Sequence, residues 1–395
     1  MTHMTSPARK TAAIALLMNM TILGVFPLDV ILPSFPSMAR YFDTAVADIA
    51  LSVSLFSIGL SLSLLLVGPL SDRVGRKRVL IIGMGVAVMG SAGCAMAQDF
   101  AWFMVFRMIQ AIGCGSFVLS QALVQDLFIG KEQERLRIAM VTASGICISV
   151  SPLFGSWLQT WLDWRGSFQV FVIIGLLLIL KAWLLLDAPS PPSDTRLSIV
   201  NAYRQVLRDR SFVGYWLISA LAFSCHFAFI VVSPIILMEQ LGLTPYRFAL
   251  VLLLYGAAYV LGGIAAGWMN RWMDGNTQIV TGQRLIASAG VLMLALYHLW
   301  GLTVMTVMLP MILCTAGTTI TRPIATSRAM GRFPLAAGTC ASAGNVIIFV
   351  CGGLVSSLVS QSGEQVMNVL AITFLVLSGI GMGLNAREQR SAHAA

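Results

Sequence analysis

The feature that most constrains this chain is a series of apolar runs, almost free of charge, that recurs from one end of the sequence to the other. A helix needs about 20 such residues to cross the ~30 Å hydrocarbon core of a membrane, where its backbone groups must be satisfied internally. Hydrophobic residues make up 57% of the 395 residues and charged residues only 10%. A soluble domain is roughly 45–50% apolar. The sequence therefore predicts an all-α integral membrane protein.

Twelve apolar runs are closed by charges, prolines or glycine clusters, and they predict twelve transmembrane helices. These are expected at residues 11–33, 47–70, 78–97, 100–123, 138–160, 168–187, 212–237, 246–269, 283–300, 302–321, 336–360 and 365–384. The longest polar connection separates the sixth run from the seventh, which suggests a repeat architecture. The predicted domains are an N-terminal bundle at 1–187, a cytoplasmic linker at 188–211 with a short amphipathic helix, and a C-terminal bundle at 212–395.

Lysine and arginine positions predict the orientation, because cytoplasmic loops carry an excess of these residues. With the N-terminus inside, only Arg40, Arg165 and Arg247 among the residues outside the spans fall on the periplasmic side. Both termini are therefore expected in the cytoplasm. Orientation and attraction to anionic lipid account for the net charge of +9, and no nucleic-acid partner is expected.

Motifs for metal, redox or enzymatic chemistry are missing from the sequence. The seven cysteines show no CxxC or histidine-paired spacing, so neither a metal site nor a disulfide framework is predicted. There is no HExxH motif, nucleophile elbow or GxxxxGK[ST] phosphate loop. We expect a protein that is not an enzyme, holds no cofactor and does not hydrolyse ATP.

A charged stretch, VGPLSDRVGRKRVLIIG at residues 67–83, lies between the second and third apolar runs. It resembles the G-x-L-(a)-D-R-x-G-R-(K/R) signature of the major facilitator superfamily. The alternative is a positive-inside loop that contains an aspartate by chance. The resemblance implies a fold of two pseudo-symmetric six-helix bundles. The matching residues are Gly68, Asp72, Arg73, Gly75 and Arg76.

Further matches resemble the twelve-helix drug/proton antiporters, in particular Bcr/CflA-like multidrug exporters. They lie in the stretches Leu28–Pro36 and Arg107–Gly115 and in an antiporter motif that includes Gly145, Pro152 and Gly155. This resemblance implies a monomer in the bacterial inner membrane that exports small organic molecules by alternating access. The proton gradient would supply the energy. The alternatives are an exporter of an endogenous siderophore, metallophore or other metabolite, and a membrane sensor that transports nothing.

Asp29 and Arg107 are the strongly charged residues that fall deep in predicted spans. A charge in hydrocarbon is costly, so both are candidates for function. With a helix rise of about 1.5 Å per residue, both lie in the periplasmic third of the membrane. We expect Asp29 to take a proton from the periplasm and release it to the cytoplasm, with Arg107 tuning its proton affinity. The alternative is a static ion pair.

A second group of polar and aromatic residues could face a central substrate cavity. Each alone is more often a packing residue, but together they suit an apolar pocket with few polar groups. The C-terminal half offers few cationic candidates, mainly Arg322, which favours neutral or weakly charged cargo. The predicted cavity residues are Asn19, Gln110, Phe223, His226, Phe227, Tyr255, Tyr259, Thr318 and Asn345.

The charged stretch also predicts a conformational latch. Asp72 would face the N-terminus of the eleventh helix, where a helix dipole favours negative charge. Arg73 and Arg76 would bridge to Asp126 at the end of the fourth helix. Such contacts would exist only while the cytoplasmic side is closed and would favour the outward-open state.

Overall fold

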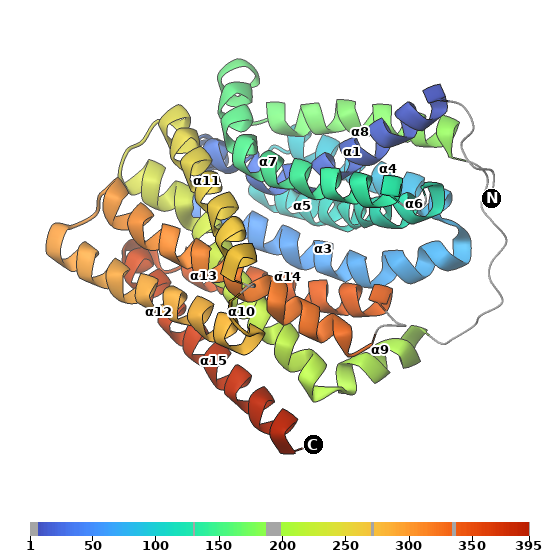
Figure 1. Cartoon of the computed structure of the whole chain (residues 1–395). Coiled ribbons are helices and arrows are strands. Elements are labelled where there is room, and N and C mark those ends of the chain that lie inside the picture. The colour runs from blue at the N-terminus through green and yellow to red at the C-terminus, as the bar shows by residue number, and fades with distance from the viewer. Residues whose placement is uncertain (1–6, 129–130, 187–198, 270–271, 334–336, 395) are drawn as a thin grey trace. The chain divides into compact units, whose positions relative to one another are not determined.

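The computed structural model describes residues 7–128, 131–186, 199–269, 272–333 and 337–394. Some side chains within these ranges lie outside the description, those of Asp72, Arg73 and Gly145 among them. The roles predicted for these three residues therefore stay predictions. The described backbone is built of helices and contains no strand (Figure 1).

Among the described residues, eight α-helices lie before residue 187 and seven lie after residue 198. The first group comprises α1 (Pro7–Asp29), α2 (Phe35–Phe42), α3 (Val46–Val74), α4 (Arg76–Met96), α5 (Phe100–Cys114), α6 (Leu119–Leu127), α7 (Lys131–Leu162) and α8 (Gly166–Leu185). The second comprises α9 (Ile199–Arg208), α10 (Arg210–Pro234), α11 (Pro245–Met269), α12 (Gly275–Trp300), α13 (Val304–Gly331), α14 (Ala337–Ser360) and α15 (Val366–Ala394).

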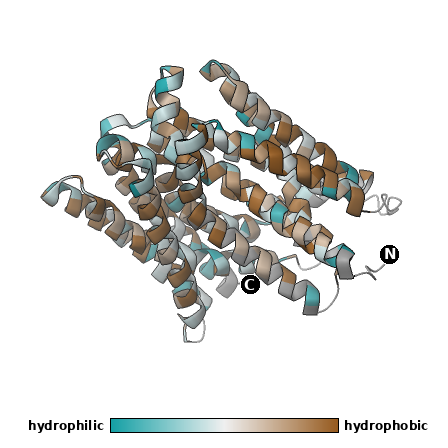
Figure 2. Cartoon of the chain, turned by 90° about the horizontal axis from the view of Figure 1, so that it is seen from above, coloured by the Kyte–Doolittle hydropathy of each residue, from teal (hydrophilic) through white to brown (hydrophobic). Residues whose placement is uncertain are grey.

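Some spans consist of two helices in succession. A 3-10 turn at Leu32–Ser34 joins α1 to α2, and another at Gly115–Val118 joins α5 to α6. Counted this way, 11 helices among the described residues are long and apolar enough to cross a membrane. The helix α7, with 32 residues, is a further long one. Hydrophobic residues, coloured brown, recur along the long helices, as Figure 2 shows. The predicted all-α membrane fold is confirmed.

Several helices extend beyond the predicted spans. The helix α12 begins at Gly275 rather than at 283, because Asp274 accepts hydrogen bonds from the backbone N–H groups of Asn276 and Thr277. The predicted ends at 321 and 384 are also too early, since α13 runs to Gly331 and α15 to Ala394. The prediction followed the apolar runs, which mark where contact with lipid ends. A helix can continue in water with polar residues, so its ends lie elsewhere.

The residues form two compact units. Unit 1 contains residues 1–43 and 59–196, and unit 2 contains residues 44–58 and 197–395. In unit 1, α1 packs against α7 and α8, and α4 packs against α5 and α8. In unit 2, α10 packs against α13, α14 and α15, and α12 packs against α13 and α15.

The helix α3 contributes to both units. Its residues up to Ile58 belong with unit 2, because small side chains join this part of α3 to α14. The hydroxyls of Ser54 and Ser356 lie 2.8 Å apart, and the Ser57 hydroxyl donates to the Phe349 carbonyl oxygen at 3.3 Å. Gly353 has no side chain to hold the two helices apart at this point.

The short helix α9 lies in the predicted linker and packs onto unit 2. Its Val206 is buried in a cluster with Phe212 and Trp216. Next to it, Asp209 accepts a hydrogen bond from the Phe212 N–H at 2.7 Å and forms an ion pair with Arg332 at 2.8 Å. Burial alone would raise the pKa of Asp209, but the hydrogen bonds from Arg332 and Phe212 outweigh it and hold that pKa below its usual value.

Candidate functional site

Arg107 is fully buried in unit 1 and holds the end of α1. One guanidinium nitrogen donates to the Gln110 side-chain oxygen at 2.7 Å, and the other donates to the Pro27 carbonyl oxygen at 3.3 Å. The last carbonyl groups of a helix have no partner within it, and a cation is favourable there. The Phe168 ring lies 5.8 Å from the guanidinium carbon. Arg107 therefore acts as a cap for the C-terminus of α1.

Gln110 extends this contact into a buried chain of hydrogen bonds. Its amide nitrogen donates to the Ser91 hydroxyl at 3.1 Å, and that hydroxyl donates to the Phe168 carbonyl oxygen at 3.1 Å. Gly90 allows the approach, since a methyl group there would overlap the Gln110 backbone. The chain thus joins α1, α5, α4 and α8 within unit 1. Gln110 was predicted to line a substrate cavity, but its described contacts belong to this network.

Asp29 is the last residue of α1 and is 8% exposed. Its carboxylate forms no hydrogen bond or ion pair with the described residues, and Arg107 contacts Pro27 instead. The described ion pairs do not include one between Asp29 and Arg107. A proton-coupling role for Asp29 stays a prediction.

The helix α7 lies close to the chain that follows Asp29. A methyl group at Gly155 would overlap the Val30 carbonyl oxygen, so only glycine fits this approach. Pro152 lies buried inside the same helix. The close approach is the packing use that the predicted antiporter motif implies for its glycines. It leaves Asp29 beside a tight junction of α1 and α7.

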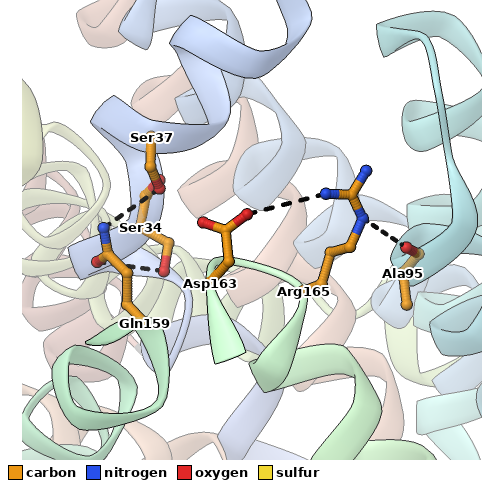
Figure 3. Close-up of polar contacts among 6 residues, drawn as sticks. All are labelled: Ser34, Ser37, Ala95, Gln159, Asp163 and Arg165. Carbon is orange, nitrogen blue, oxygen red and sulfur yellow. Dashed lines mark hydrogen bonds and ion pairs between the residues drawn. The ribbon is translucent and has the colours of Figure 1, made fainter. Parts of the chain in front are cut away.

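Polar contacts continue at the far end of α7, as Figure 3 shows. The Gln159 amide nitrogen donates to the Ser37 hydroxyl at 3.2 Å, and its oxygen accepts from the Ser34 hydroxyl at 3.5 Å. Arg165 donates to the Ala95 carbonyl oxygen at 3.0 Å and lies 3.8 Å from the Asp163 carboxylate. These contacts tie α7 to α2, and the start of α8 to α4.

Unit 2 contains a second buried hydrogen-bond chain, formed by α10, α11 and α13. The Thr315 hydroxyl donates to the Tyr255 hydroxyl at 2.6 Å, and the Tyr255 hydroxyl lies 2.5 Å from His226 Nδ1. With Thr315 donating, the Tyr255 proton is left for Nδ1. A neutral imidazole then carries its own proton on Nε2. His226 thus has a defined donor at Nε2.

Further aromatic contacts lie on the same helix, α10, and next to His226. Phe223 stacks on Phe227 with 5.2 Å between ring centroids, and Phe349 meets the Phe223 ring edge-on at 5.7 Å. The Arg322 guanidinium lies over the Phe223 ring at 4.7 Å, within the range of a cation–π contact. The Tyr259 ring is 5.5 Å from the His226 ring. Five predicted cavity residues thus fall into two contact groups, Phe223 with Phe227 and His226 with Tyr255 and Tyr259.

The other predicted cavity residues do not join this group. The Thr318 hydroxyl donates to the Ala222 carbonyl oxygen at 3.1 Å and so ties α13 to α10. The Asn19 side chain donates to the Ala15 carbonyl oxygen of its own helix at 2.7 Å. Asn345 is half-buried in α14 and has no described contact with the His226 group. Thr315, which the sequence analysis missed, shares a face with Thr318 and Thr319, and this spacing was a usable signal.

The charged stretch between α3 and α4 turns at Gly75, whose φ of 100° favours glycine. Arg76 forms an ion pair with Asp126 and donates to the Ala122 carbonyl oxygen at 2.9 Å. This contact was predicted, and it joins α4 to α6 within unit 1. Lys77, one of the lysines and arginines used to predict the orientation, donates to the Leu186 carbonyl oxygen at 2.5 Å at the end of α8. The latch role of Gly68, Asp72 and their neighbours stays a prediction.

Comparison with known proteins supplies the family. The family model of the Major Facilitator Superfamily matches residues 12–357. A Bacillus subtilis protein described as an uncharacterized MFS-type transporter, YdgK, is 27% identical over 378 residues, which cover 93% of each chain. A chloramphenicol resistance protein of Pseudomonas aeruginosa is 27% identical over 95% of this chain and 90% of its own. The multidrug resistance protein MdtL of Citrobacter koseri is 25% identical over 96% of both chains.

Solved structures agree on the fold. The crystal structure of a D-xylose-proton symporter superposes with a TM-score of 0.74 over 96% of this chain and 97% of its own, at 16% identity. A bacterial homologue of the human lysosomal transporter Spinster, in an inward-facing and unoccupied conformation, gives a TM-score of 0.73 over 97% and 98%, also at 16% identity. Family and fold are those of transporters and not of enzymes. They correspond to a multi-pass protein of the bacterial inner membrane.

Proposed function

Because this chain belongs to the major facilitator superfamily, we propose that it exports small organic molecules, drugs among them, in exchange for protons. The observation that carries the proposal is the match to drug exporters over nearly the whole chain. A chloramphenicol resistance protein and a multidrug resistance protein each align with at least 95% of it. Chloramphenicol is therefore the first substrate to test.

Proton coupling is proposed on the position of Asp29. A carboxylate that is 8% exposed inside a span, with no ion pair or hydrogen bond among the described residues, has nothing to stabilise its charge. Such a group is neutral while it is shielded and ionises when water reaches it. A conformational change that exposes Asp29 to one side and then to the other would therefore load and release a proton.

The direction of coupling is proposed on the relatives, since the fold serves symporters as well. Exporters remove a drug from the cytoplasm while protons flow inward, which is antiport. We propose a monomer in contact with membrane lipid, with the Arg76–Asp126 contact as part of a latch that changes during alternating access. Each six-helix bundle would then move as a body around the substrate.

The test uses everted membrane vesicles whose interior is acidified and reported by a pH-sensitive dye. Addition of chloramphenicol should release protons from vesicles that contain the wild-type chain. Asp29→Asn should abolish this release, and Asp43→Asn, which changes an exposed carboxylate of the same unit, should leave it intact. Full proton release by Asp29→Asn would refute the coupling role. Drug flux that ignores the proton gradient would indicate a facilitator.

A second candidate function is export of an endogenous anionic metabolite such as a siderophore or metallophore. The half-buried Arg322 favours it, since a cation inside a span suits anionic cargo. A deletion strain would then keep its drug susceptibility but retain a metabolite that its parent secretes. A membrane sensor would change neither drug susceptibility nor secretion.

A further inference from the structure

Arg322 is a cation inside a membrane span that the described part of the chain does not neutralise. It lies in α13, within the span Val304–Gly331, and is half-buried. No carboxylate among the described residues lies within 4 Å of its guanidinium group, and its buried Nε has no hydrogen-bond partner there. A charge in this setting is costly and calls for a partner.

The neighbouring His226 presents a hydrogen-bond donor in the same unit. Its Nδ1 is occupied by the Tyr255 hydroxyl, which leaves the proton on Nε2. No hydrogen-bond partner of Nε2 is found among the described residues, although the side chain is only 9% exposed. The Nε2–H group of His226 is therefore available to donate to an acceptor that the described residues do not supply.

Arg322 and His226 both adjoin one turn of α10. Residues three and four apart share a helix face, so His226 and Phe227 both follow Phe223 on that face. The Arg322 guanidinium lies over the Phe223 ring at 4.7 Å. Contacts above and below fix this register: Ser219 meets Thr326 at 3.2 Å between hydroxyl oxygens, and Thr318 donates to the Ala222 carbonyl. A cation, a donor and an aromatic stack are thus assembled within one unit.

We propose that Arg322, His226, Phe223 and Phe227 form a subsite for a planar substrate that carries a negatively charged hydrogen-bond acceptor, such as the carboxylate of an aromatic acid. Arg322 would neutralise the carboxylate, His226 Nε2–H would donate to it, and the Phe223–Phe227 stack would contact the ring. This inference rests on the proposed function, because the subsite would define the class of molecule that the exporter carries. Organic cations are excluded from it by the positive charge of Arg322.

Binding to the purified chain in detergent tests the subsite without any transport step. Radiolabelled salicylate, a planar aromatic carboxylate, is the probe, and unlabelled salicylamide and benzylamine are the competitors. The wild-type chain should bind salicylate, with weaker competition by neutral salicylamide and none by cationic benzylamine. Arg322→Gln should weaken salicylate binding by about tenfold or more, because a hydrogen bond to a charged group contributes about 1.5–3 kcal/mol.

Matched variants separate the subsite from general effects of charge and folding. Arg284→Gln removes one positive charge from an exposed position of unit 2 and should leave salicylate binding unchanged. Arg322→Lys keeps the charge without the planar guanidinium and should give an intermediate loss. His226→Gln should weaken salicylate and salicylamide together, since both accept a hydrogen bond. A thermal melt of each variant shows whether it is folded.

Two results would overturn the subsite. The first is that folded Arg322→Gln binds salicylate as tightly as the wild type does. The second is that benzylamine displaces salicylate as effectively as salicylamide does. The outcome is independent of the proposed function. Salicylate binding that depends on Arg322, without any gradient-driven flux, would support the subsite and refute the exporter. Proton-coupled export of chloramphenicol together with salicylate binding that ignores Arg322 would do the reverse.

Discussion

Arg107 in unit 1 and Arg322 in unit 2 are both arginines inside membrane spans, but their surroundings differ. Arg107 is fully buried and donates to Gln110 and to the Pro27 carbonyl oxygen. Arg322 is half-buried, lies over the Phe223 ring and has no hydrogen-bond partner among the described residues. The helix C-terminus and an amide stabilise the first charge, whereas a ring face is the described contact of the second.

This difference separates a charge that is held by structural contacts from a charge that is available to bind a ligand. Removal of a structural charge leaves its former partners without hydrogen bonds inside the membrane, so stability falls. Removal of an available charge changes which ligand binds and leaves packing intact. The same contrast holds for hydrogen-bond chains, since Gln110 is bonded at both ends while His226 has an open Nε2.

The largest expected effect is that of Arg107→Gln. The shorter side chain cannot reach the Pro27 carbonyl, so α1 loses its cap and Gln110 loses a charged partner. We expect a loss of stability of about 3 kcal/mol, measured as a lower melting temperature in detergent. Arg322→Gln is the matched variant and should melt within roughly 1 kcal/mol of wild type. Equal destabilisation by the two substitutions would remove the contrast between the two arginines.

The next largest effect is expected for Gly155→Ala, which should lower the stability of the folded chain by about 1–3 kcal/mol. The added methyl group would overlap the Val30 carbonyl oxygen and push α7 away from α1. Gly85→Ala is the control in the same unit, since nothing lies within 4 Å of the added methyl group. The control should be neutral or slightly stabilising, as alanine favours a helix. A melting temperature that Gly155→Ala leaves unchanged would show that the junction beside Asp29 is loose.

A smaller effect is expected for Tyr255→Phe in unit 2. It removes the hydroxyl that joins His226 to Thr315. Loss of one such bond costs about 1 kcal/mol, and the imidazole is then free to carry its proton on Nδ1. Salicylate binding should weaken several-fold while Tyr259→Phe, whose hydroxyl has no described hydrogen bond, binds as wild type. If both variants bind equally well, the orientation of His226 does not depend on Tyr255.

The smallest effect is the pH dependence of the Asp209–Arg332 contact. Asp209 has a lowered pKa in the folded chain. The ionised Asp209 therefore contributes its full stabilisation of the folded chain above about pH 3.9, the usual aspartate pKa. This stabilisation is lost as the pH falls through the lower pKa that Asp209 has in the folded chain. Asp209→Asn, which can still cap α10, should cost less than about 1 kcal/mol at neutral pH, because the pair is partly exposed. In acid, the melting temperatures of the variant and the wild type should become equal. A difference that persists in acid would contradict this account.

The fold was largely predictable, because lipid leaves a sequence few solutions. Each crossing must be a long apolar helix, so the spans can be recognised from composition. Helix ends were less predictable: Asp274 starts α12 well before its apolar run, through a capping contact that no run length reports. The assignment of the first part of α3 to unit 2 depends on serine and glycine contacts with α14, which also leave no mark on hydropathy.

The site was predictable in its residue types and less so in its partners. Buried charge singled out Arg107, and spacing grouped Tyr255 with Tyr259. The partner of Arg107 on α1 is the carbonyl oxygen of Pro27, and a backbone group cannot be found by residue type. Asp29 and Arg107 were paired because their depths matched. Depth does not specify direction around a helix, so the actual contacts of Arg107 could not be derived.

Lys77 has a consequence for how the topology of this chain can be altered. Its ammonium group closes the C-terminal end of α8 through the Trp183 and Leu186 carbonyl oxygens, at 2.8 and 2.5 Å. The residue is predicted to act as an orientation signal during insertion, and in the folded chain it acts as a hydrogen-bond donor. A redesign that moves this charge along the loop would preserve the predicted orientation signal. It would nevertheless leave the carbonyl oxygens at the end of α8 without this hydrogen-bond donor. Charge count and charge position are therefore separate design variables in the loop between α3 and α4.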